Sequence, residues 1–391
     1  MPLRLLTILL GLAVVFVVLW AMWPSPISPT YWDEPEPPVM TGPLQPDTAL
    51  RNADVFSVGG PGTAEGLAVS PEGFVYFGTR DGRIQQLTPQ PDGTARIDTV
   101  AQIGDTMILG LEWLRPQVLG VAAISGLYAV NLERDQYTLI SSGVPAHPFG
   151  YVNDLAPAPD GRIYFTDSST RWGHTADNSG YIYEMLENRP NGALYVWDPA
   201  LHQTRLVRDR LYYPNGVEIA ADGESVLIAE SFRYRIIRVW VDGPMRGQID
   251  IFADNLPGIP EGLQSDGRGR LFVAMPSRRS SLLGLLHRTP VLARLLVKLP
   301  QWALQGLGGP PRPFIMVLDE RTGDVLETLH DPDGEFCFIS NLDIDAFGTA
   351  WFGSSDCGYV ARLPLPDLPA PAPSPGGSSD LPSAPLRSDH H

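Results

Sequence analysis

The stretch Glu65–Thr79, with the sequence EGLAVSPEGFVYFGT, carries the pattern that decides the fold. It opens on a polar residue and a glycine, continues as a short strand, turns at a second glycine and enters another apolar strand. Related stretches begin at Leu109, Asn153, Asn215, Glu261 and Asn341. Repeats of about 40 residues built from short strands are typical of a β-propeller. The pattern therefore predicts an all-β fold, a six-bladed β-propeller.

Four of the copies begin with the side chains that we expect to bind a metal through oxygen, namely Glu65, Asn153, Asn215 and Glu261. A propeller brings equivalent positions of its blades to one ring around the central axis. Calcium prefers carboxylate and amide oxygens, and this set leaves coordination positions for water and substrate. An asparagine that opens a strand is also an ordinary turn residue. The recurrence at equivalent positions, rather than any one side chain, predicts a site for Ca²⁺ or another divalent cation.

Length and charge limit the alternatives. The chain has 391 residues and a formal net charge of -16. This length fits one large propeller with extensions better than two ordinary domains. The acidic balance argues against nucleic acid as a partner, because phosphate binding requires clustered Lys and Arg.

An apolar run at residues 5–23 is long enough, at helical rise, to cross a bilayer. Arg4 precedes the run, and no further Lys or Arg occurs before Arg51. The positive-inside rule then places the propeller on the periplasmic, extracytoplasmic side. A cleaved signal peptide is the alternative, but the run ends in tryptophans instead of a small-residue cleavage site. We therefore predict a single-pass transmembrane signal-anchor at residues 1–23.

The remaining segments are distinguished by composition. Residues 24–48 are Pro-rich and acidic, which predicts a stiff spacer from the membrane. Residues 49–365 contain the repeats, and we expect the segment 50–58 to supply the strand that closes the sixth blade. Residues 366–391 are rich in Pro, Ser and Gly, which predicts a disordered tail.

The fifth blade contains an insertion at residues 276–313, where leucines recur at helical spacing between basic residues. This pattern predicts an amphipathic helical insertion. It is compatible with a segment that rests on anionic lipid and with a lid that packs its leucines onto the propeller.

The chain has two cysteines, Cys337 and Cys357, at the ends of the hairpin of the sixth blade. The propeller pattern places both on one face. A disulfide is possible in an exported protein, and two buried free thiols are also compatible with the sequence.

Several stretches resemble the strictosidine synthase-like family. They are FGYVNDLAPAPDGRIYFTDSSTRW (149–172), YEMLENRPNGALYVWDP (183–199), YPNGVEIAADGESVLIAESFRYRI (213–236) and LHDPDGE (329–335). The resemblance covers about residues 60–363, and the wider superfamily includes paraoxonases, gluconolactonases and regucalcin. It implies a divalent metal, usually calcium, in the central channel, serving ester or lactone hydrolysis. The positions that match the family's metal ligands are Glu65, Asn153, Asn215 and Glu261.

This sequence departs from those relatives at three positions. Glu261 stands where the family usually has Asp. Asn341 stands where strictosidine synthase has its catalytic Glu, which argues against that enzyme's condensation chemistry. The second-blade copy has Leu109 where paraoxonases carry a histidine.

The resemblance therefore favours metal-dependent hydrolysis of a small-molecule ester or lactone, as in arylesterases and lactonases. We expect Glu261 to assist the attacking water as a base. His147 precedes the third-blade ligand and is the histidine best placed to shuttle protons, although it is also compatible with an ordinary surface loop. Asp154 is expected to hold its neighbour Asn153 in place. The departures also fit a second hypothesis, a non-catalytic membrane-anchored binding module with a structural calcium.

Overall fold

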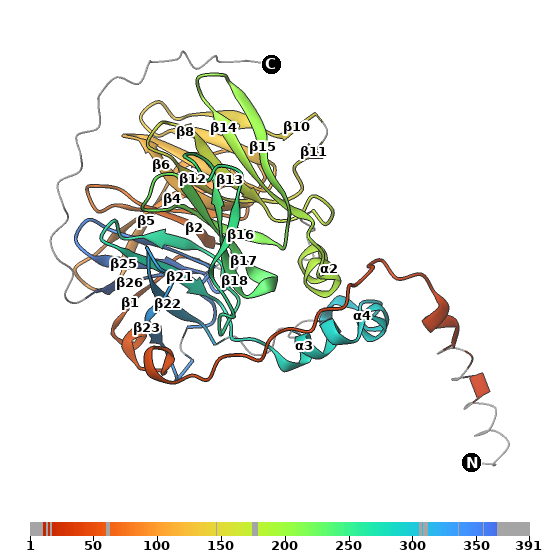
Figure 1. Ribbon diagram of the computed structural model, residues 1–391. Helices are drawn as coiled ribbons and strands as arrows, with labels where there is room; N and C mark the ends of the chain where they lie inside the picture. The colour runs from red at the N-terminus through yellow and green to blue at the C-terminus, as the bar shows by residue number, and fades with distance from the viewer. Residues whose placement is uncertain are drawn as a thin grey trace.

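The computed structural model describes residues 11–12, 15, 18–59, 63–145, 147–173, 179–304, 307, 312–334, 336–354 and 356–365. Six four-stranded antiparallel sheets make up most of the molecule (Figure 1). The innermost strand of each sheet contacts the innermost strand of the next, and the last contacts the first. The prediction of an all-β, six-bladed propeller is therefore confirmed.

The first three blades follow the repeat order of the sequence. Blade one contains β2 (Thr63–Val69), β3 (Val75–Thr79), β4 (Arg83–Pro89) and β5 (Ala95–Gln102). Blade two contains β6 (Ile108–Arg115), β7 (Val118–Ala123), β8 (Gly126–Asn131) and β9 (Gln136–Ser141). Blade three contains β12 (Val152–Pro157), β13 (Ile163–Asp167), β14 (Gly192–Asp198) and β15 (Gln203–Leu211). A short pair, β10 (Gly143–Val144) and β11 (His147–Pro148), lies in the connection between blades two and three.

The other three blades complete the ring. Blade four contains β16 (Pro214–Ile219), β17 (Ser225–Glu230), β18 (Arg235–Trp240) and β19 (Ile249–Ala253), with the 3₁₀ turn η3 (Ser231–Arg233). Blade five contains β20 (Leu263–Ser265), β21 (Arg270–Met275), β22 (Phe314–Asp319) and β23 (Val325–His330). Blade six contains β24 (Asn341–Ile344), β25 (Thr349–Gly353), β26 (Tyr359–Pro364) and β1 (Asp54–Ser57).

Strand β1 closes the propeller, as the sequence predicted for the segment 50–58. It pairs antiparallel with β26, with Asp54 opposite Arg362 and Phe56 opposite Val360. The sixth sheet therefore combines strands from both ends of the repeat region, so the ring cannot open without breaking this pairing.

The core lies between the blades. The second strand of a blade is buried over its whole length in β3, β7, β13 and β17, because both of its faces pack on neighbouring sheets. Between blades five and six, for example, Phe272 and Ile315 pack against Phe352. The outermost strands alternate between buried and exposed positions or are mostly exposed, as β15 shows. Apolar layers between sheets therefore fix the radial position of every innermost strand.

Glycines near the axis let the innermost strands approach closely. A Cβ atom on Gly216 would lie 2.3 Å from the carbonyl oxygen of Glu261 in the next blade. A Cβ atom on Gly262 would lie 2.4 Å from Oδ1 of Asn341. A glycine is therefore required directly after Asn215 and Glu261, because a larger residue there would collide with the next blade. This contact holds the preceding residue at the mouth of the channel.

Two insertions form a helical cap, the name we use for α2–α5. Helix α2 (Ser179–Glu187) follows β13, while α3 (Ser281–Arg288), α4 (Pro290–Leu296) and α5 (Gln301–Leu304) follow β21. Ile182 and Leu186 of α2 share an apolar cluster with Leu283 of α3. Each insertion follows the second strand of its blade. Because the first and second strands are antiparallel, the insertions lie at the end of the blade where the innermost strand begins. The cap therefore lies at the same face as the predicted metal ring.

Residues 27–36, which we call the strap, run along the helical cap (Figure 1). The backbone N–H of Thr30 donates to the carbonyl of Glu187 (3.1 Å), and that of Trp32 donates to the carbonyl of His287 (3.1 Å). The 3₁₀ turns η1 (Gly42–Leu44) and η2 (Ala49–Asn52) then contact β23. The Pro-rich segment 24–48 is extended, but it packs on the protein and does not stand free of it.

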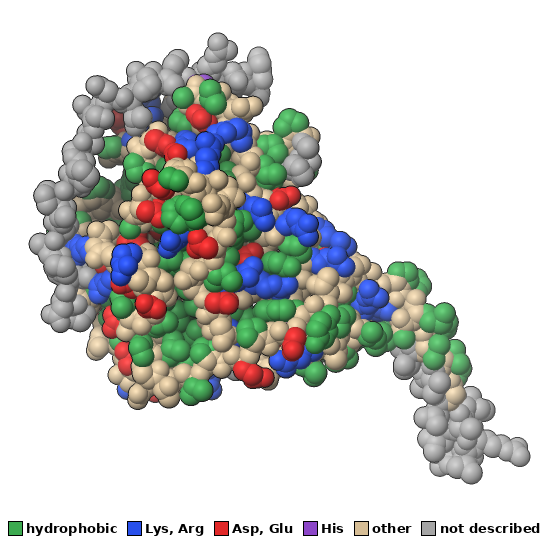
Figure 2. All heavy atoms as spheres, viewed as in Figure 1, with side chains coloured by type: hydrophobic (Ala, Val, Ile, Leu, Met, Phe, Trp, Pro, Cys, Tyr) green, Lys and Arg blue, Asp and Glu red, His purple; other side chains and the backbone are tan. Residues whose placement is uncertain are grey.

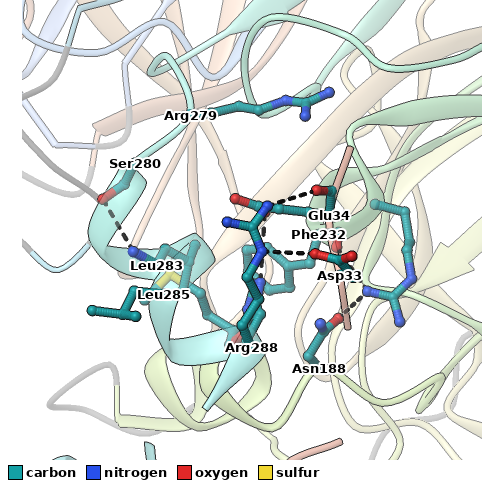
Figure 3. A network of polar contacts seen from close by, with 12 residues as sticks. Asp33, Glu34, Asn188, Phe232, Arg279, Ser280, Leu283, Leu285 and Arg288 are labelled. Carbon is teal, nitrogen blue, oxygen red and sulfur yellow. Dashed lines mark hydrogen bonds and ion pairs between the residues drawn. The ribbon is translucent and has the colours of Figure 1, made fainter. Parts of the chain in front are cut away.

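Arginines of the insertion hold the strap (Figure 3). Nε of Arg288 donates to Oδ1 of Asp33 (2.8 Å), and its NH2 donates to the carbonyl of Glu34 (3.0 Å). Arg279 donates to the carbonyls of Leu256 (2.6 Å) and Pro35 (2.9 Å). The strap and the insertion are therefore joined by charge-assisted hydrogen bonds.

The termini and the cysteines complete the description. Residues 18–22 are helical, but much of the predicted anchor at 5–23 and all of the tail at 366–391 lie outside the described residues. Among the helices that are described, none has the length and apolar character needed to span a membrane. Cys337 and Cys357 form a disulfide with their Cα atoms 6.5 Å apart, which decides between the two alternatives that the sequence left open.

Candidate metal and active site

The ring predicted from the repeats lies at the mouth of the central channel. Glu65 is in β2, Asn153 in β12 and Asn215 in β16, while Glu261 precedes β20. The backbone N–H of Gly216 donates to the carbonyl of Glu261 (3.1 Å), so the fourth and fifth blades are joined at this level. Asn153 and Glu261 are buried.

Among the described residues, none donates a hydrogen bond to the oxygen atoms of these side chains. Glu65, Asn215 and Glu261 make no side-chain hydrogen bond or ion pair with any described residue. Asn153 uses only its amide nitrogen, which donates to Oγ of Ser168 (2.8 Å). Ser168 in turn donates to the carbonyl of Pro214 (2.8 Å), so the amide of Asn153 is held in orientation. Two carboxylates and two amides without protein donors are a donor set that fits a hard divalent cation.

The two carboxylates of the ring destabilise each other in their charged forms. Burial, with a smaller contribution from Asp356, raises the pKa of Glu65 to about 8, although Arg80 opposes the shift. The pKa of Glu261 is also raised well above its usual value, first by burial and then by Glu65 and Asp356. A cation between the carboxylates would relieve this repulsion.

Sequence reasoning missed Asp356 and Arg80, which both act on the ring electrostatically. Asp356 lies in the turn between β25 and β26, beside the disulfide cysteine Cys357. Arg80 follows β3 and makes no hydrogen bond or ion pair within the described part of the chain. The position of Asp356 next to one of the two cysteines was the one signal that could have drawn attention to it.

Tyrosines line the third- and fourth-blade side of the mouth. The rings of Tyr151 and Tyr213 lie 6.2 Å apart, and those of Tyr213 and Tyr181 lie 5.6 Å apart. Burial raises the pKa of all three phenols, with further contributions from the nearby Glu261. The phenols therefore stay protonated and can donate hydrogen bonds. Because Tyr181 belongs to α2, the helical cap contributes to this site.

A second set of acidic side chains joins neighbouring blades. The backbone N–H of Val217 donates to Asp154 (3.0 Å), that of Ser265 donates to Glu218 (3.0 Å), and that of Val69 donates to Asp343 (2.6 Å). Burial raises the pKa of Asp154 to about 7. The expectation that Asp154 holds Asn153 was therefore wrong: its carboxylate holds the next blade.

Of the three positions that depart from the family pattern, Glu261 belongs to the ring, whereas Leu109 and Asn341 contribute no ligand to it. Leu109 is buried in a small cluster with Met107 and Tyr151. The Oδ1 atom of Asn341 accepts from the backbone N–H of Leu342 (2.8 Å). No three His, Cys, Asp or Glu side chains of the described chain are grouped closely enough to bind a metal by themselves. The proposed ring would therefore need its two amides.

The side chain of His147, which we expect to shuttle protons, lies outside the described part of the chain. Its backbone pairs with Val144 between β11 and β10.

A pocket of about 620 Å³ opens between blades one and two on the same face, and it is lined by Arg80, Ile103, Asp105, Thr106, Met107, Ile124, Ser125 and Tyr128. Since Arg80 also acts on Glu65, this pocket adjoins the ring.

Comparison with known proteins decides the family. The strictosidine synthase-like N-terminal model matches residues 42–87, and the strictosidine synthase model matches residues 153–244. The adipocyte plasma membrane-associated protein of Rattus norvegicus is 30% identical over 93% of this chain and 99% of its own length. Its counterpart in Danio rerio is 32% identical over 92% and 88%. This chain belongs to the strictosidine synthase-like family.

Solved structures similar to this strictosidine synthase-like protein share its fold. A gluconolactonase from Xanthomonas campestris aligns with a TM-score of 0.57 at 17% identity, covering 87% of this chain and 99% of that one. A regucalcin from Agrobacterium tumefaciens, described as a calcium-binding protein, aligns with a TM-score of 0.52 at 14% identity over 77% and 92%. At these identities the likeness is one of architecture, so the chemistry must be argued from the site.

Proposed function

We propose that this protein is a calcium-dependent hydrolase of esters or lactones, similar in type to an arylesterase or lactonase. The observation that carries the proposal is a ring of side-chain oxygen atoms to which no described residue donates a hydrogen bond: Glu65, Asn153, Asn215 and Glu261. The architecture shared with a gluconolactonase and with a calcium-binding regucalcin supports it.

The residues of the site have complementary roles in this proposal. Calcium held by the ring would polarise the carbonyl of the substrate as a Lewis acid. Glu261, a buried carboxylate beside Glu65, would accept a proton from the attacking water. The protonated phenols of Tyr181 and Tyr213 would donate hydrogen bonds to the charge that develops on the carbonyl oxygen. His147 remains a proposed proton shuttle on sequence grounds alone.

We also propose that the protein is anchored in a membrane by one N-terminal helix, with the propeller on the extracytoplasmic side. The apolar run at residues 5–23 and its flanking charges support this topology. The relatives in Rattus norvegicus and Danio rerio are named plasma membrane-associated proteins. The disulfide between Cys337 and Cys357 fits an oxidising compartment.

A non-catalytic binding module with a structural calcium is the second candidate. It is favoured by Leu109 and Asn341, which leave the second and sixth blades without an acid or a histidine at the repeat start. In that case the cation would stabilise the ring against repulsion between Glu65 and Glu261 without promoting a reaction.

The deciding experiment measures hydrolysis of phenyl acetate and of γ- and δ-lactones by the full chain, with calcium and with excess chelator. Turnover that disappears on chelation and returns with calcium supports the hydrolase. Absence of turnover together with a calcium-dependent rise in thermal stability supports the binding module. Absence of both effects contradicts a calcium site in the ring.

A further inference from the structure

The insertion at residues 276–313 has a charge opposite to that of the rest of the protein. It contains five Arg and one Lys and no Asp or Glu, whereas the whole chain has a formal net charge of -16. Two of these cations, Arg279 and Arg288, are bound to the strap. Arg294 is exposed and makes no hydrogen bond or ion pair within the described part of the chain.

The helices of the insertion carry two apolar faces. Leu283, Leu286 and Ala293 are fully buried in the cluster shared with α2. By contrast, each of the three helices has a large apolar side chain in solvent: Leu285 is 48% exposed, Val291 70% and Trp302 75%. A helix that only covers the propeller needs one apolar face, so the outward face requires a separate explanation. Large apolar side chains exposed on successive helices are typical of an interaction surface.

The N-terminal helical residues are attached directly to this insertion. Nζ of Lys298, just after α4, donates to the carbonyls of Trp20 (3.0 Å), Ala21 (3.0 Å) and Trp23 (2.6 Å). It also lies 5.6 Å from the ring centre of Trp20. A lysine at these carbonyls satisfies the open end of a helix and opposes its dipole. The end of the apolar N-terminal run is therefore held beside the exposed face of the insertion.

The N-terminal helix also carries exposed apolar side chains. Leu19, Met22 and Trp23 are exposed, and Lys298 binds the carbonyl of Trp23 itself. Figure 2 shows hydrophobic side chains along the N-terminal arm, and Lys and Arg side chains where that arm meets the body of the protein. Apolar side chains bordered by cations, with tryptophans at the boundary, match the depth profile of a bilayer surface.

We infer that α3–α5 form a docking surface for an anionic lipid bilayer, in which Leu285, Val291 and Trp302 enter the headgroup region and Arg294 faces lipid phosphates. Lys298 fixes the geometry because it joins the surface to the N-terminal helix. The cations of the insertion favour an anionic bilayer over a second copy of the chain. In a symmetric dimer the same face of both copies would meet, so cations would face cations. The cap, and with it the mouth of the channel, would then lie near the membrane.

The test places an environment-sensitive fluorophore on the full chain in vesicles. Trp302→Cys carries the label on the proposed surface, and Phe347→Cys, at another strongly exposed aromatic position in the loop between β24 and β25, carries it in the matched control. The native cysteines are protected by their disulfide. Vesicles contain phosphatidylcholine with or without phosphatidylserine and a lipid-borne quencher.

We expect the label at position 302 to shift its emission to the blue and to be quenched, more strongly with phosphatidylserine, while the label at 347 is unaffected. Arg294→Gln should weaken the quenching on anionic vesicles. Absence of quenching at 302 overturns the docking surface. A blue shift at 302 that grows with protein concentration in the absence of lipid overturns it in favour of self-association. Because both positions are exposed, thermal unfolding of the labelled variants should match that of the parent.

Discussion

At the channel mouth, the charged forms of individual buried carboxylates are energetically unfavourable unless a ligand is bound. Glu261 is buried, and its pKa is raised by burial and by Glu65. Its carboxylate makes no hydrogen bond or ion pair within the described chain. A group in such an environment stores electrostatic free energy that binding of a cation can release. This property links the two proposed roles of Glu261, as a ligand and as a base.

Glu261→Gln tests these roles because it removes the charge and keeps the shape. We expect hydrolysis of esters or lactones to fall by about 100-fold or more, since loss of a general base has effects of this size. Calcium affinity should fall, and stability without calcium should rise because the repulsion with Glu65 is gone. Glu327→Gln, at an exposed position of β23, is the matched control. Unchanged turnover in Glu261→Gln would contradict a catalytic role.

His330 makes the fold sensitive to acid independently of the ring. It is 3% exposed, its Nε2 atom has no hydrogen-bond partner among the residues that the structure describes, and its ring stacks on Phe314 at 4.8 Å. Burial lowers its pKa from 6.5 to about 4, and Arg278 contributes, whereas Asp47 opposes the shift. The folded protein therefore favours neutral His330. Its contribution to stability is complete above the unfolded pKa and is lost as the pH falls from about 6.5 toward 4.

His330→Phe should remove this part of the acid sensitivity. Between pH 7 and pH 5 we expect the parent to lose about 2 kcal/mol more unfolding free energy than the variant, from linkage at a single histidine. Denaturant unfolding at the two pH values measures the difference. His202→Gln, in an exposed turn, should behave like the parent. Equal losses in His330→Phe and the parent would show that His330 is not buried in its neutral form.

Among the secondary-structure elements, the helical cap depends on the strap that crosses it. Ile27 is buried in the cluster that contains Ile182 and Leu283, so the strap contributes to the packing between α2 and α3. Trp32 lies between Tyr234, at 5.7 Å, and His287, at 5.6 Å. The strap therefore joins the insertions of blades three and five with the loop of blade four, and it helps to position Tyr181 at the site.

Arg279→Ala should release the strap without unfolding the propeller. Arg279 donates to Leu256, Pro35 and Asn255, and hydrogen bonds from charged groups contribute about 1.5–3 kcal/mol each. We expect amide hydrogen exchange in residues 28–36 to accelerate at least about tenfold, the factor for 1.4 kcal/mol. Exchange in β13 and β17 should not change. Arg83→Ala, which removes an exposed pair with Asp81, is the control. An unchanged exchange rate in the strap would contradict this role.

The closed ring depends on a short strand from outside the repeats. Phe56 of β1 is 3% exposed and lies 6.2 Å from the ring of Trp351. Its cluster includes Leu67 of blade one and Val360 of blade six, so it packs at the joint where the first and last blades meet. Weakening this joint should affect every blade because the sheets support one another in a circle.

Phe56→Ala should lower the free energy of unfolding by about 3–5 kcal/mol, the usual cost of removing a buried phenylalanine. Because the joint closes the ring, we expect calcium-dependent stabilisation to weaken as well. Val55→Ala, at a half-exposed position of the same strand, should cost much less. Thermal and denaturant unfolding with and without calcium measure both effects. If Phe56→Ala only makes residues 54–57 more mobile and leaves the unfolding free energy unchanged, the other blades hold together without closure by β1.

Much of the fold could be predicted from local patterns. The recurring start of each copy identified six blades and placed Glu65, Asn153, Asn215 and Glu261 at equivalent positions. The closing strand followed from the short apolar segment ahead of the first repeat. These predictions succeeded because a propeller repeats one unit, so the position of a residue in its unit determines its distance from the axis.

Other features depend on contacts between segments that are far apart in the sequence. Glu34 and Arg288 meet across 254 positions, and Val69 and Asp343 across 274. No periodicity predicts such pairs, because they arise where the surfaces of finished blades and insertions come together. Asp154 illustrates the difference: its place in the repeat suggested a metal-site role, but its carboxylate binds the next blade. The sequence by itself determined the six blades and the equivalent positions of the oxygen-bearing side chains that we propose as ligands. Only the tertiary structure decided the strap, the disulfide and the roles of Asp356 and Arg80, because these depend on which loops the closed ring brings together.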